Sequence, residues 1–328
     1  MELTVHRRTK IFRGGAIISF LRQVWRVKHL YLFVLPSLAL VTIWCYIPII
    51  QAMTLGFTAW RLPDATHRLG YRQFVGLANF QRALQDEKFW NSFLNLGKVL
   101  AVNLFSALVV SLLAAVILHH LRSQRARRAY QIGFVSPLAV PGAVLLLVWN
   151  FIYNPHAGAL NRILVGLGFS SFQDFGWLGK PETALWAILF TGFPFIGVTQ
   201  TLVYLGGLQN IPQDIYDSAS LDGVTAWQRL VLVEIPLIAS QIRLILLLTI
   251  IGSFTMYQSI LIMMSGGQVS DVGGARVGWP PTLVPALHLF NNAFVFEKYE
   301  YATALGMILL LFILVTGWLT RRLIPGEG

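Results

Sequence analysis

The chain has 328 residues, of which 55% are hydrophobic and only 12% are charged. Charged residues make up about a quarter of an average soluble domain, so this composition excludes an ordinary soluble protein and indicates a polytopic membrane protein. The net charge of +11 does not point to nucleic acid as a partner, because the charged residues lie between apolar blocks, as they do in the loops of membrane proteins.

The first part of the chain predicts a basic cytoplasmic segment at residues 1–29 and a first membrane span at 30–53. The apolar block at 30–53 is too long for the core of a signal peptide and lacks a small-residue cleavage site. The single cysteine, Cys45, lies in this block, cannot form an intramolecular disulfide and is expected to be a small packed residue.

A second span is predicted at residues 99–118, which carry no charge. His119 and His120 follow it and lead into a basic loop that ends at Arg128. Adjacent helical side chains point about 100° apart, and no Cys, Asp or Glu accompanies the two histidines, so an interfacial role is favoured over metal binding.

Four later apolar blocks complete an all-α fold with six transmembrane helices. Residues 132–153 are interrupted by Pro137 and Pro141, and because breaks at membrane depth need protein or water to satisfy the freed backbone groups, this span is expected inside the bundle. The remaining spans are predicted at 183–208, 237–264 and 302–319. The membrane domain thus covers residues 30–322, with a cytoplasmic tail at 323–328 and a Gly-rich external segment at 265–281 of unassigned role.

The polar stretch at residues 209–236 predicts two short helices at the membrane surface. Pro212 suits an early helical position, with Gln209 or Asn210 as the cap, and the Asp222-Gly223 pair predicts the turn that ends the first helix.

The second helix is predicted to begin at Thr225, an N-cap whose partner in a capping box is Gln228. Pro236 is expected to stop it before the next apolar block.

The spacing of Asp217, Ser218 and Ala219 from Gly223 and Pro236 resembles the loop motif of bacterial ATP-binding-cassette importer permeases. In that family the loop docks on a cytoplasmic ATPase subunit, so the resemblance implies a coupling loop. The family has Glu and Ala where this chain has Asp217 and Ser218. The resemblance implies that Asp217 offers a carboxylate to an ATPase cation and that Asp222 and Gly223 make the turn. It also implies apolar anchoring by Trp227 and Leu230.

Short phrases elsewhere resemble the carbohydrate-importing branch of the same family. They lie at residues 76–80, 154–161, 177–179 and 204–212. The resemblance implies a type I importer permease fold in a bacterial inner membrane, with both termini cytoplasmic and with lipid around it. It implies four kinds of partner: a homologous second permease, two ATPase subunits that bind ATP and Mg, an external solute-binding protein, and a sugar or oligosaccharide. Transport would proceed by alternating access.

The distribution of charge agrees with this orientation. Fifteen of the 25 Lys and Arg residues lie on the side that would hold the coupling loop, as cytoplasmic segments do.

No phosphate-binding Gly-x-x-x-x-Gly-Lys-Ser/Thr motif, metal-ligand spacing or Gly-x-Ser-x-Gly occurs in the sequence, and no span holds paired carboxylates. The chain is therefore expected to be no enzyme, to bind no cofactor and no metal, and to rely on ATP hydrolysis in partner subunits. Two alternatives stay open: an ion-coupled sugar carrier, disfavoured by the absence of mid-span Asp, Glu and Lys, and a membrane-embedded enzyme or assembly factor acting on lipid or glycan.

The spans instead carry uncharged polar and aromatic groups, which suit a neutral polyhydroxylated solute. Thr249, Ser253 and Tyr257 recur at intervals of four and are predicted to share one helical face. The alternative is that such groups hydrogen-bond neighbouring helices, and a polyol, a glycerophosphodiester or an acidic oligosaccharide stays open as the solute. The candidate pathway residues are Trp149, Asn150, Gln200, Thr249, Ser253 and Tyr257, joined by Asn103, Ser106 and Gln258.

Overall fold

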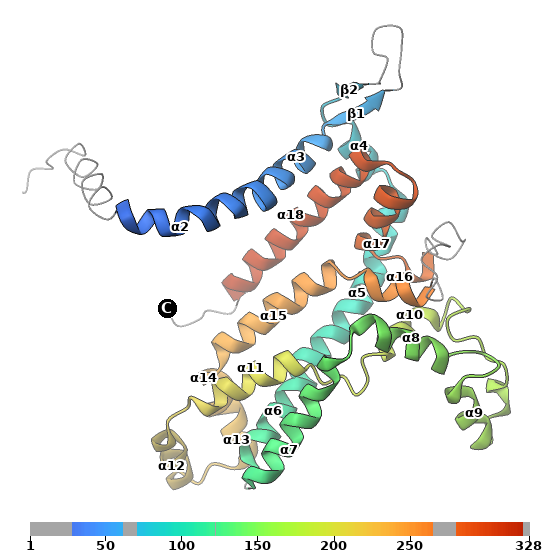
Figure 1. Cartoon of the computed structure of the whole chain (residues 1–328). Coiled ribbons are helices and arrows are strands. Elements are labelled where there is room, and N and C mark those ends of the chain that lie inside the picture. Colours follow the sequence, from blue (N-terminus) through green and yellow to red (C-terminus); the bar gives the residue numbers. More distant parts are fainter. Residues whose placement is uncertain (1–27, 62–70, 122, 265–279, 324–328) are drawn as a thin grey trace, which may run out of the picture. The chain divides into compact units, whose positions relative to one another are not determined.

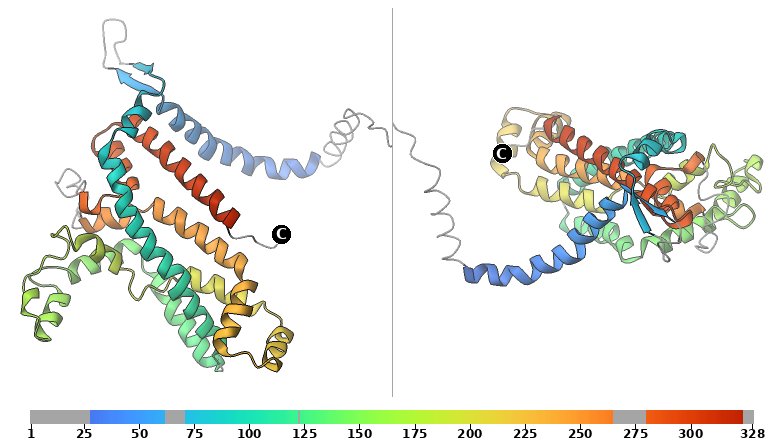
Figure 2. Two further views of the ribbon diagram at one scale, coloured as in Figure 1. Left: turned by 180° about the vertical axis from the view of Figure 1, so that it is seen from behind. Right: turned by 90° about the horizontal axis from the view of Figure 1, so that it is seen from above.

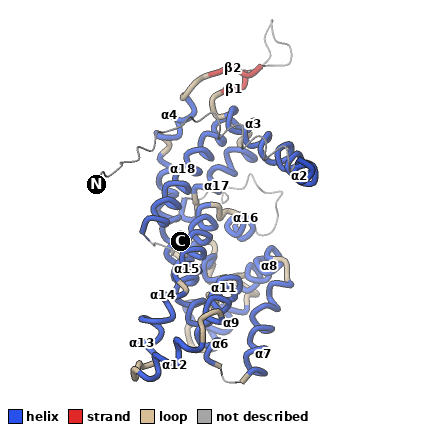
Figure 3. The backbone as a smooth tube through the Cα atoms, turned by 90° about the vertical axis from the view of Figure 1, so that its left-hand side faces the viewer, coloured by secondary structure: helices blue, strands red, loops and turns tan. Residues whose placement is uncertain are grey.

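The computed structural model describes residues 28–61, 71–121, 123–264 and 280–323, and its regular elements are helices apart from one small antiparallel sheet (Figure 3). Most of the predicted basic segment, of the tail and of the Gly-rich segment lies outside the described residues.

The chain divides into two compact units at Thr54. The first unit is a helix made of α2 (Lys28–Val41), the π turn η1 (Thr42–Tyr46) and α3 (Ile47–Leu55), which runs through the unit boundary. It corresponds to the first predicted span. Cys45 is exposed, so the packing expected for it is not made within this unit. The reason is that η1 and α3 bury none of their residues.

The first half of the second unit contains the sheet and the start of the helical bundle (Figure 1). Its elements are β1 (Thr58–Arg61), β2 (Tyr71–Phe74), α4 (Ala78–Leu84), α5 (Glu87–Phe105), η2 (Ser106–Val110), α6 (Ser111–His120), α7 (Gln124–Val135), η3 (Ser136–Ala139), α8 (Gly142–Ile152), α9 (Ala159–Gly166), η4 (Ser170–Phe172), α10 (Ala184–Phe190) and α11 (Val198–Gln209).

The second half contains the expected coupling loop and the last spans. Its elements are α12 (Gln213–Leu221), α13 (Ala226–Arg229), η5 (Leu230–Glu234), α14 (Ile235–Leu237), α15 (Ala239–Phe254), α16 (Gln258–Met264), η7 (Pro280–Thr282), α17 (Pro285–Phe290), η8 (Asn291–Val295) and α18 (Tyr299–Leu323).

The longest element is one continuous helix formed by α5, η2 and α6, from Glu87 to His120 (Figure 2). It has 34 residues, which corresponds to a length of about 50 Å at 1.5 Å per residue. The second span is predicted at 99–118, so the helix begins earlier than expected. The reason is local: the Asp86 carboxylate caps it by accepting hydrogen bonds from the backbone N–H groups of Lys88 and Phe89.

Two of the other predicted spans are bent. The third begins at Gln124, so most of the stretch expected to be a basic loop is helical, and α7 with η3 meets α8 at an angle of 89° at Val140 and Pro141. The fifth begins inside the coupling loop, where the helix from Ala226 to Leu237 meets α15 at 73°.

The fourth predicted span is divided into α10 and α11, with irregular backbone between Thr191 and Gly197. Within the described residues three helices are long and apolar enough to cross a membrane, and up to five are if each bent pair counts as one span. Six spans were predicted, and the one not included in these five is the fourth, which is divided into two helices.

Apolar side chains form separate clusters in two parts of the bundle. One cluster connects α6, α11 and α15 through Leu118, Tyr204, Leu208 and Ile245. Another connects α8, α10, α16 and α17. Helices α11 and α15 approach closely at Gly207, where a Cβ atom would lie 3.0 Å from the Gln241 side chain.

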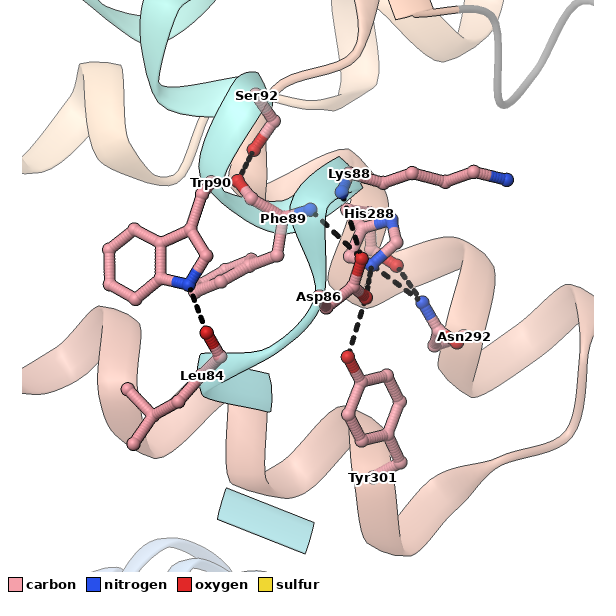
Figure 4. A network of polar contacts seen from close by, with 9 residues as sticks. All are labelled: Leu84, Asp86, Lys88, Phe89, Trp90, Ser92, His288, Asn292 and Tyr301. Atoms are coloured by element: carbon pink, nitrogen blue, oxygen red, sulfur yellow. Dashed lines mark hydrogen bonds and ion pairs between the residues drawn. The ribbon is translucent and has the colours of Figure 1, made fainter. Parts of the chain in front are cut away.

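A polar network fixes the first turn of the long helix to the last part of the chain (Figure 4). The Asp86 Oδ2 atom accepts hydrogen bonds from Tyr301 Oη at 2.5 Å and from His288 Nε2 at 2.8 Å. The Asn292 amide donates to the His288 backbone oxygen at 2.9 Å. Asp86 therefore caps α5 with one oxygen and binds α17 and α18 with the other.

These contacts also set the acidity of Asp86. Burial acts to raise the pKa of this carboxyl, but hydrogen bonds from Tyr301 and His288 and the charge of His288 outweigh it, and the pKa lies below its ordinary value. A carboxyl with a lowered folded-state pKa adds stability that is present above its unfolded pKa and is lost as the pH falls through its folded pKa.

We expect Asp86→Asn to lower the free energy of unfolding by about 1–2 kcal/mol at pH 7, because asparagine keeps the helix cap but loses the charge opposite His288. The difference from wild type should shrink as the pH falls below about 4. Thermal unfolding in detergent from pH 7 to pH 3 measures both effects. The matched control is Asp174→Asn, which removes the carboxylate of an exposed His156–Asp174 pair and should change stability by less than about 0.5 kcal/mol. Equal losses in the two variants would contradict the assignment.

Candidate functional site

A cavity of about 440 Å³ lies against the middle of the long helix. It is bounded by the junction of α5 with η2, by the start of α11 and by α15, and its lining is a mixture of amide, hydroxyl and aliphatic groups. The lining residues are Asn103, Ser106, Thr199, Gln200, Ile245, Leu248, Thr249, Gly252 and Ser253. Three of the six candidate pathway residues, Gln200, Thr249 and Ser253, are thus brought together, with Asn103 and Ser106 beside them.

Hydrogen bonds organise one wall of this cavity. The Asn103 amide donates to Ser253 Oγ at 2.9 Å, and that hydroxyl donates to the Thr249 backbone oxygen at 2.8 Å. The Thr249 hydroxyl is buried and has no hydrogen-bond partner in the part of the chain that the structure describes. Since buried hydroxyls are normally paired, the Thr249 hydroxyl is a donor and acceptor beside the cavity that no described residue uses.

The break between α10 and α11 ends at Gly197, just before the lining residues Thr199 and Gln200, and two serines of the long helix satisfy its backbone. Ser106 Oγ donates to the Phe195 backbone oxygen at 2.7 Å, and Ser111 Oγ accepts from the Gly197 N–H at 2.8 Å. Irregular backbone at membrane depth is tolerated only where protein or water satisfies it. The two serines therefore permit the break that shapes the cavity.

Gln200 reaches the cavity because residue 197 is glycine. A Cβ atom there would lie 2.2 Å from Gln200 Oε1, which is shorter than any real contact. The side chain therefore folds back over the start of α11 in space that only glycine leaves free.

The other candidate pathway residues lie elsewhere. The Asn150 amide donates to the Met263 backbone oxygen at 3.0 Å, as the helix-bridging alternative expects, and Asn150 lines a second cavity of about 310 Å³. Trp149 packs on Tyr153, with ring centroids 5.4 Å apart.

The prediction that Tyr257 shares a helical face with Thr249 and Ser253 is wrong. Helix α15 ends at Phe254, so Tyr257 follows the end of that helix, and its ring stacks on Phe290 at 5.0 Å. Gln258 is the first residue of the next helix, α16.

The expected coupling loop contains the two predicted helices, α12 and α13 (Figure 1). The turn between them is at Gly223, whose φ of +71° is in the left-handed region that glycine favours. Thr225 and Gln228 form the predicted capping box.

Two details of this loop differ from the sequence-based predictions. Pro212 is itself the N-cap residue of α12, and no side chain caps that helix. Pro236 does not stop the second helix, which continues to Leu237. The π turn η5 ends at Glu234, two residues before Pro236, and contains Leu232, whose carbonyl lies four residues before the proline and would clash with its ring in a regular helix.

The apolar side chains of the loop divide between outward and inward positions. Trp227 is 70% exposed and therefore presented outward, whereas Leu230 is 8% exposed and packs within this chain, which contradicts its expected anchoring role. Leu221 at the end of α12 is 90% exposed and was missed. The sequence did contain a signal for the exposure of Leu221. This residue comes just before the turn, and the other apolar residues of α12 lie on the opposite face of that helix.

The remaining loop residues are placed as follows. Asp217 and Ser218 lie on the exposed part of α12, where Asp217 accepts a hydrogen bond from the Gln213 amide at 3.0 Å. Ala219 is buried, and Asp222 is the exposed residue that closes α12.

Behind the loop, a polar cluster contacts the end of α6. His120 Nε2 lies 2.7 Å from Glu234 Oε1, and Arg229 Nε lies 3.4 Å from the same oxygen. Burial, followed by the negative charge of Glu234, raises the pKa of Tyr216 to about 12, so its hydroxyl stays protonated at neutral pH. The two histidines, for which the sequence predicts an interfacial role, therefore contact the coupling loop, which the sequence did not indicate.

Residues 107–327 match the family described as binding-protein-dependent transport system inner membrane component. The diacetylchitobiose uptake system permease NgcF of Streptomyces coelicolor is 28% identical over 316 residues, covering 92% of this chain and 85% of that protein. The trehalose/maltose transport permease MalF of Thermococcus litoralis is 29% identical over 286 residues, covering 87% and 89%.

The fold is also similar to a solved bacterial ABC transporter involved in the import of alginate. The TM-score is 0.71 at 19% identity, and the match covers 93% of this chain and 99% of the other. At this identity the similarity concerns the fold, and the family match covers well over half of the sequence. The chain belongs to the binding-protein-dependent transport system inner membrane component family.

Proposed function

We propose that this chain is one permease subunit of an ATP-driven importer that takes up a sugar or oligosaccharide. The observation that carries the proposal is the cavity at the middle of the long helix. Amides, hydroxyls and an unpartnered threonine surround it and could exchange hydrogen bonds with a neutral polyhydroxylated solute. Relatives named for uptake of diacetylchitobiose and trehalose/maltose support this solute class.

The proposed partners rest on the family to which the chain belongs and on the residues that its coupling loop exposes. ATP and Mg would bind to two separate ATPase subunits, which dock on the outward residues of the coupling loop, Leu221 and Trp227. A second, homologous permease would complete the pathway, and an external binding protein would deliver the solute. A solved relative of the same fold was crystallised with an alginate-bound periplasmic protein, which supports that last partner. The coupling loop and both termini would be cytoplasmic.

The proposed mechanism is alternating access. Closure of the ATPase pair moves the coupling loop, and the helices that continue from it, α11 and α14 to α15, carry two walls of the cavity. The cavity would then open first to the binding protein and afterwards to the cytoplasm.

Docking of the ATPase is tested at Gly223. We expect Gly223→Val to reduce the ATPase captured with detergent-solubilised protein about tenfold, because a β-branched residue at φ +71° costs about 1–2 kcal/mol and distorts the turn. The matched control is Gly168→Val, at a φ of +96° in the loop after α9, which should capture the ATPase normally. A folded wild-type protein that captures no ATPase would contradict the proposed function. Uptake that collapses with an ion gradient and needs no ATP would then favour the ion-coupled carrier.

Solute contact is tested at Thr249. Thr249→Val keeps the shape of the side chain and removes the hydroxyl, so uptake at low solute concentration should fall about two- to tenfold without loss of stability. The probe is whichever of labelled diacetylchitobiose, maltose or an alginate oligosaccharide the wild-type importer takes up. Thr316→Val in α18, whose hydroxyl donates to the Phe312 backbone oxygen, is the control and should leave uptake unchanged. Unchanged uptake in Thr249→Val would remove this residue from the pathway.

A further inference from the structure

The two histidines at the end of α6 each contact a different helix of the coupling loop. His119 Nε2 lies 3.2 Å from the Tyr216 hydroxyl, which belongs to α12. His120 Nε2 lies 2.7 Å from Glu234 Oε1, which belongs to η5 beyond α13. The loop is therefore joined to the long helix at two points on either side of its turn at Gly223.

The contact with Glu234 is costly to break. The Glu234 side chain is 1% exposed, and its second oxygen has no hydrogen-bond partner among the described residues. Because a buried carboxylate is tolerated only when it is paired, separating Glu234 from His120 and Arg229 would leave an uncompensated charge. The cost of leaving the Glu234 charge unpaired opposes any displacement of the loop away from the end of the long helix. The loop and the helix end therefore tend to move together.

The other end of the same helix segment reaches the cavity. Asn103 lies seventeen residues before His120 in one continuous helix, a distance of about 25 Å along the axis. A packed helix carries displacement along its axis as a rigid element. Movement of the loop would therefore reach the wall formed by Asn103 and Ser106 directly, in addition to travelling through α11 and α15.

We infer that His119, His120, Tyr216 and Glu234 form a coupling clamp, a set of positioning residues that transmits movement of the loop to the long helix and through it to the cavity wall. This inference rests on the proposed function. The clamp acts through the helix and does not contact the solute, which lies near Asn103 in the proposal. Arg229 supports the clamp through its Nε atom, which lies 3.4 Å from the same Glu234 oxygen that contacts His120.

The clamp is tested in the complete transporter, purified with its partner subunits and solute-binding protein and reconstituted in liposomes. The measurement is the amount of solute imported per ATP hydrolysed, with the labelled oligosaccharide that wild type takes up as the probe. Glu234→Gln and His120→Gln should each lower this ratio about tenfold, within the usual range of a coupling between sites. The double variant should be no worse than either single variant, because both changes remove one link.

Tyr216→Phe provides a second, milder variant that removes only a hydroxyl at the other contact. We expect it to lower the same ratio while the ATPase remains bound. The matched control is His156→Gln, which breaks an exposed histidine–carboxylate pair and should leave the ratio unchanged. A merely structural role for the clamp would reduce the amount of assembled transporter but leave the ratio of each assembled complex at the wild-type value.

The outcomes separate the clamp from the proposed function. A wild-type complex that imports none of the probe solutes with ATP would overturn the proposed function. A wild-type complex that imports solute, with Glu234→Gln and Tyr216→Phe coupling equally well, would overturn the clamp alone. Additive losses in the His120→Gln, Glu234→Gln double variant would show that the two residues act independently and would also overturn it.

Discussion

The hydrogen bonds from Ser106 and Ser111 to the backbone at Phe195 and Gly197 are the interaction on which the rest of the structure depends. A helix that crosses a membrane cannot be interrupted unless its freed N–H and C=O groups find partners. A neighbouring helix supplies two of those partners from a π turn and the residue after it. The interruption ends at Gly197, where the missing Cβ atom leaves room for the Gln200 side chain beside the cavity.

The helix that carries these serines also joins the three regions that matter for transport. Its first turn is fixed by Asp86 to His288 and Tyr301, its middle forms a cavity wall, and its last residues hold the coupling loop. Both ends are therefore held by a histidine–carboxylate pair. A rigid element with specific polar contacts at each end suits alternating access, in which discrete arrangements exchange and intermediate ones are disfavoured.

The sequence predicted the features that local chemistry determines. Gly223 and the Thr225 capping box were confirmed because they depend on a few adjacent residues. Gln200, Thr249 and Ser253, predicted as pathway residues, line one cavity, and their contact with solute stays a prediction. Predictions failed where packing decides: Tyr257 lies past the end of α15, and the Leu230 side chain is buried within this chain. Glu234 is a charged residue within an apolar run, which indicates a buried ion pair. The spacing of residues in the sequence could not identify His120 as its partner.

The dependence of the cavity on the two serines is tested most directly by amide hydrogen exchange at Gly197 in wild type and in Ser111→Ala. The Gly197 N–H donates to the Ser111 hydroxyl at 2.8 Å, so we expect its exchange to be at least about fivefold faster in the variant, which corresponds to the loss of one hydrogen bond of about 1 kcal/mol. Unchanged exchange at Gly197 in a folded variant would mean that other groups hold the break, and it would contradict the central role of the two serines.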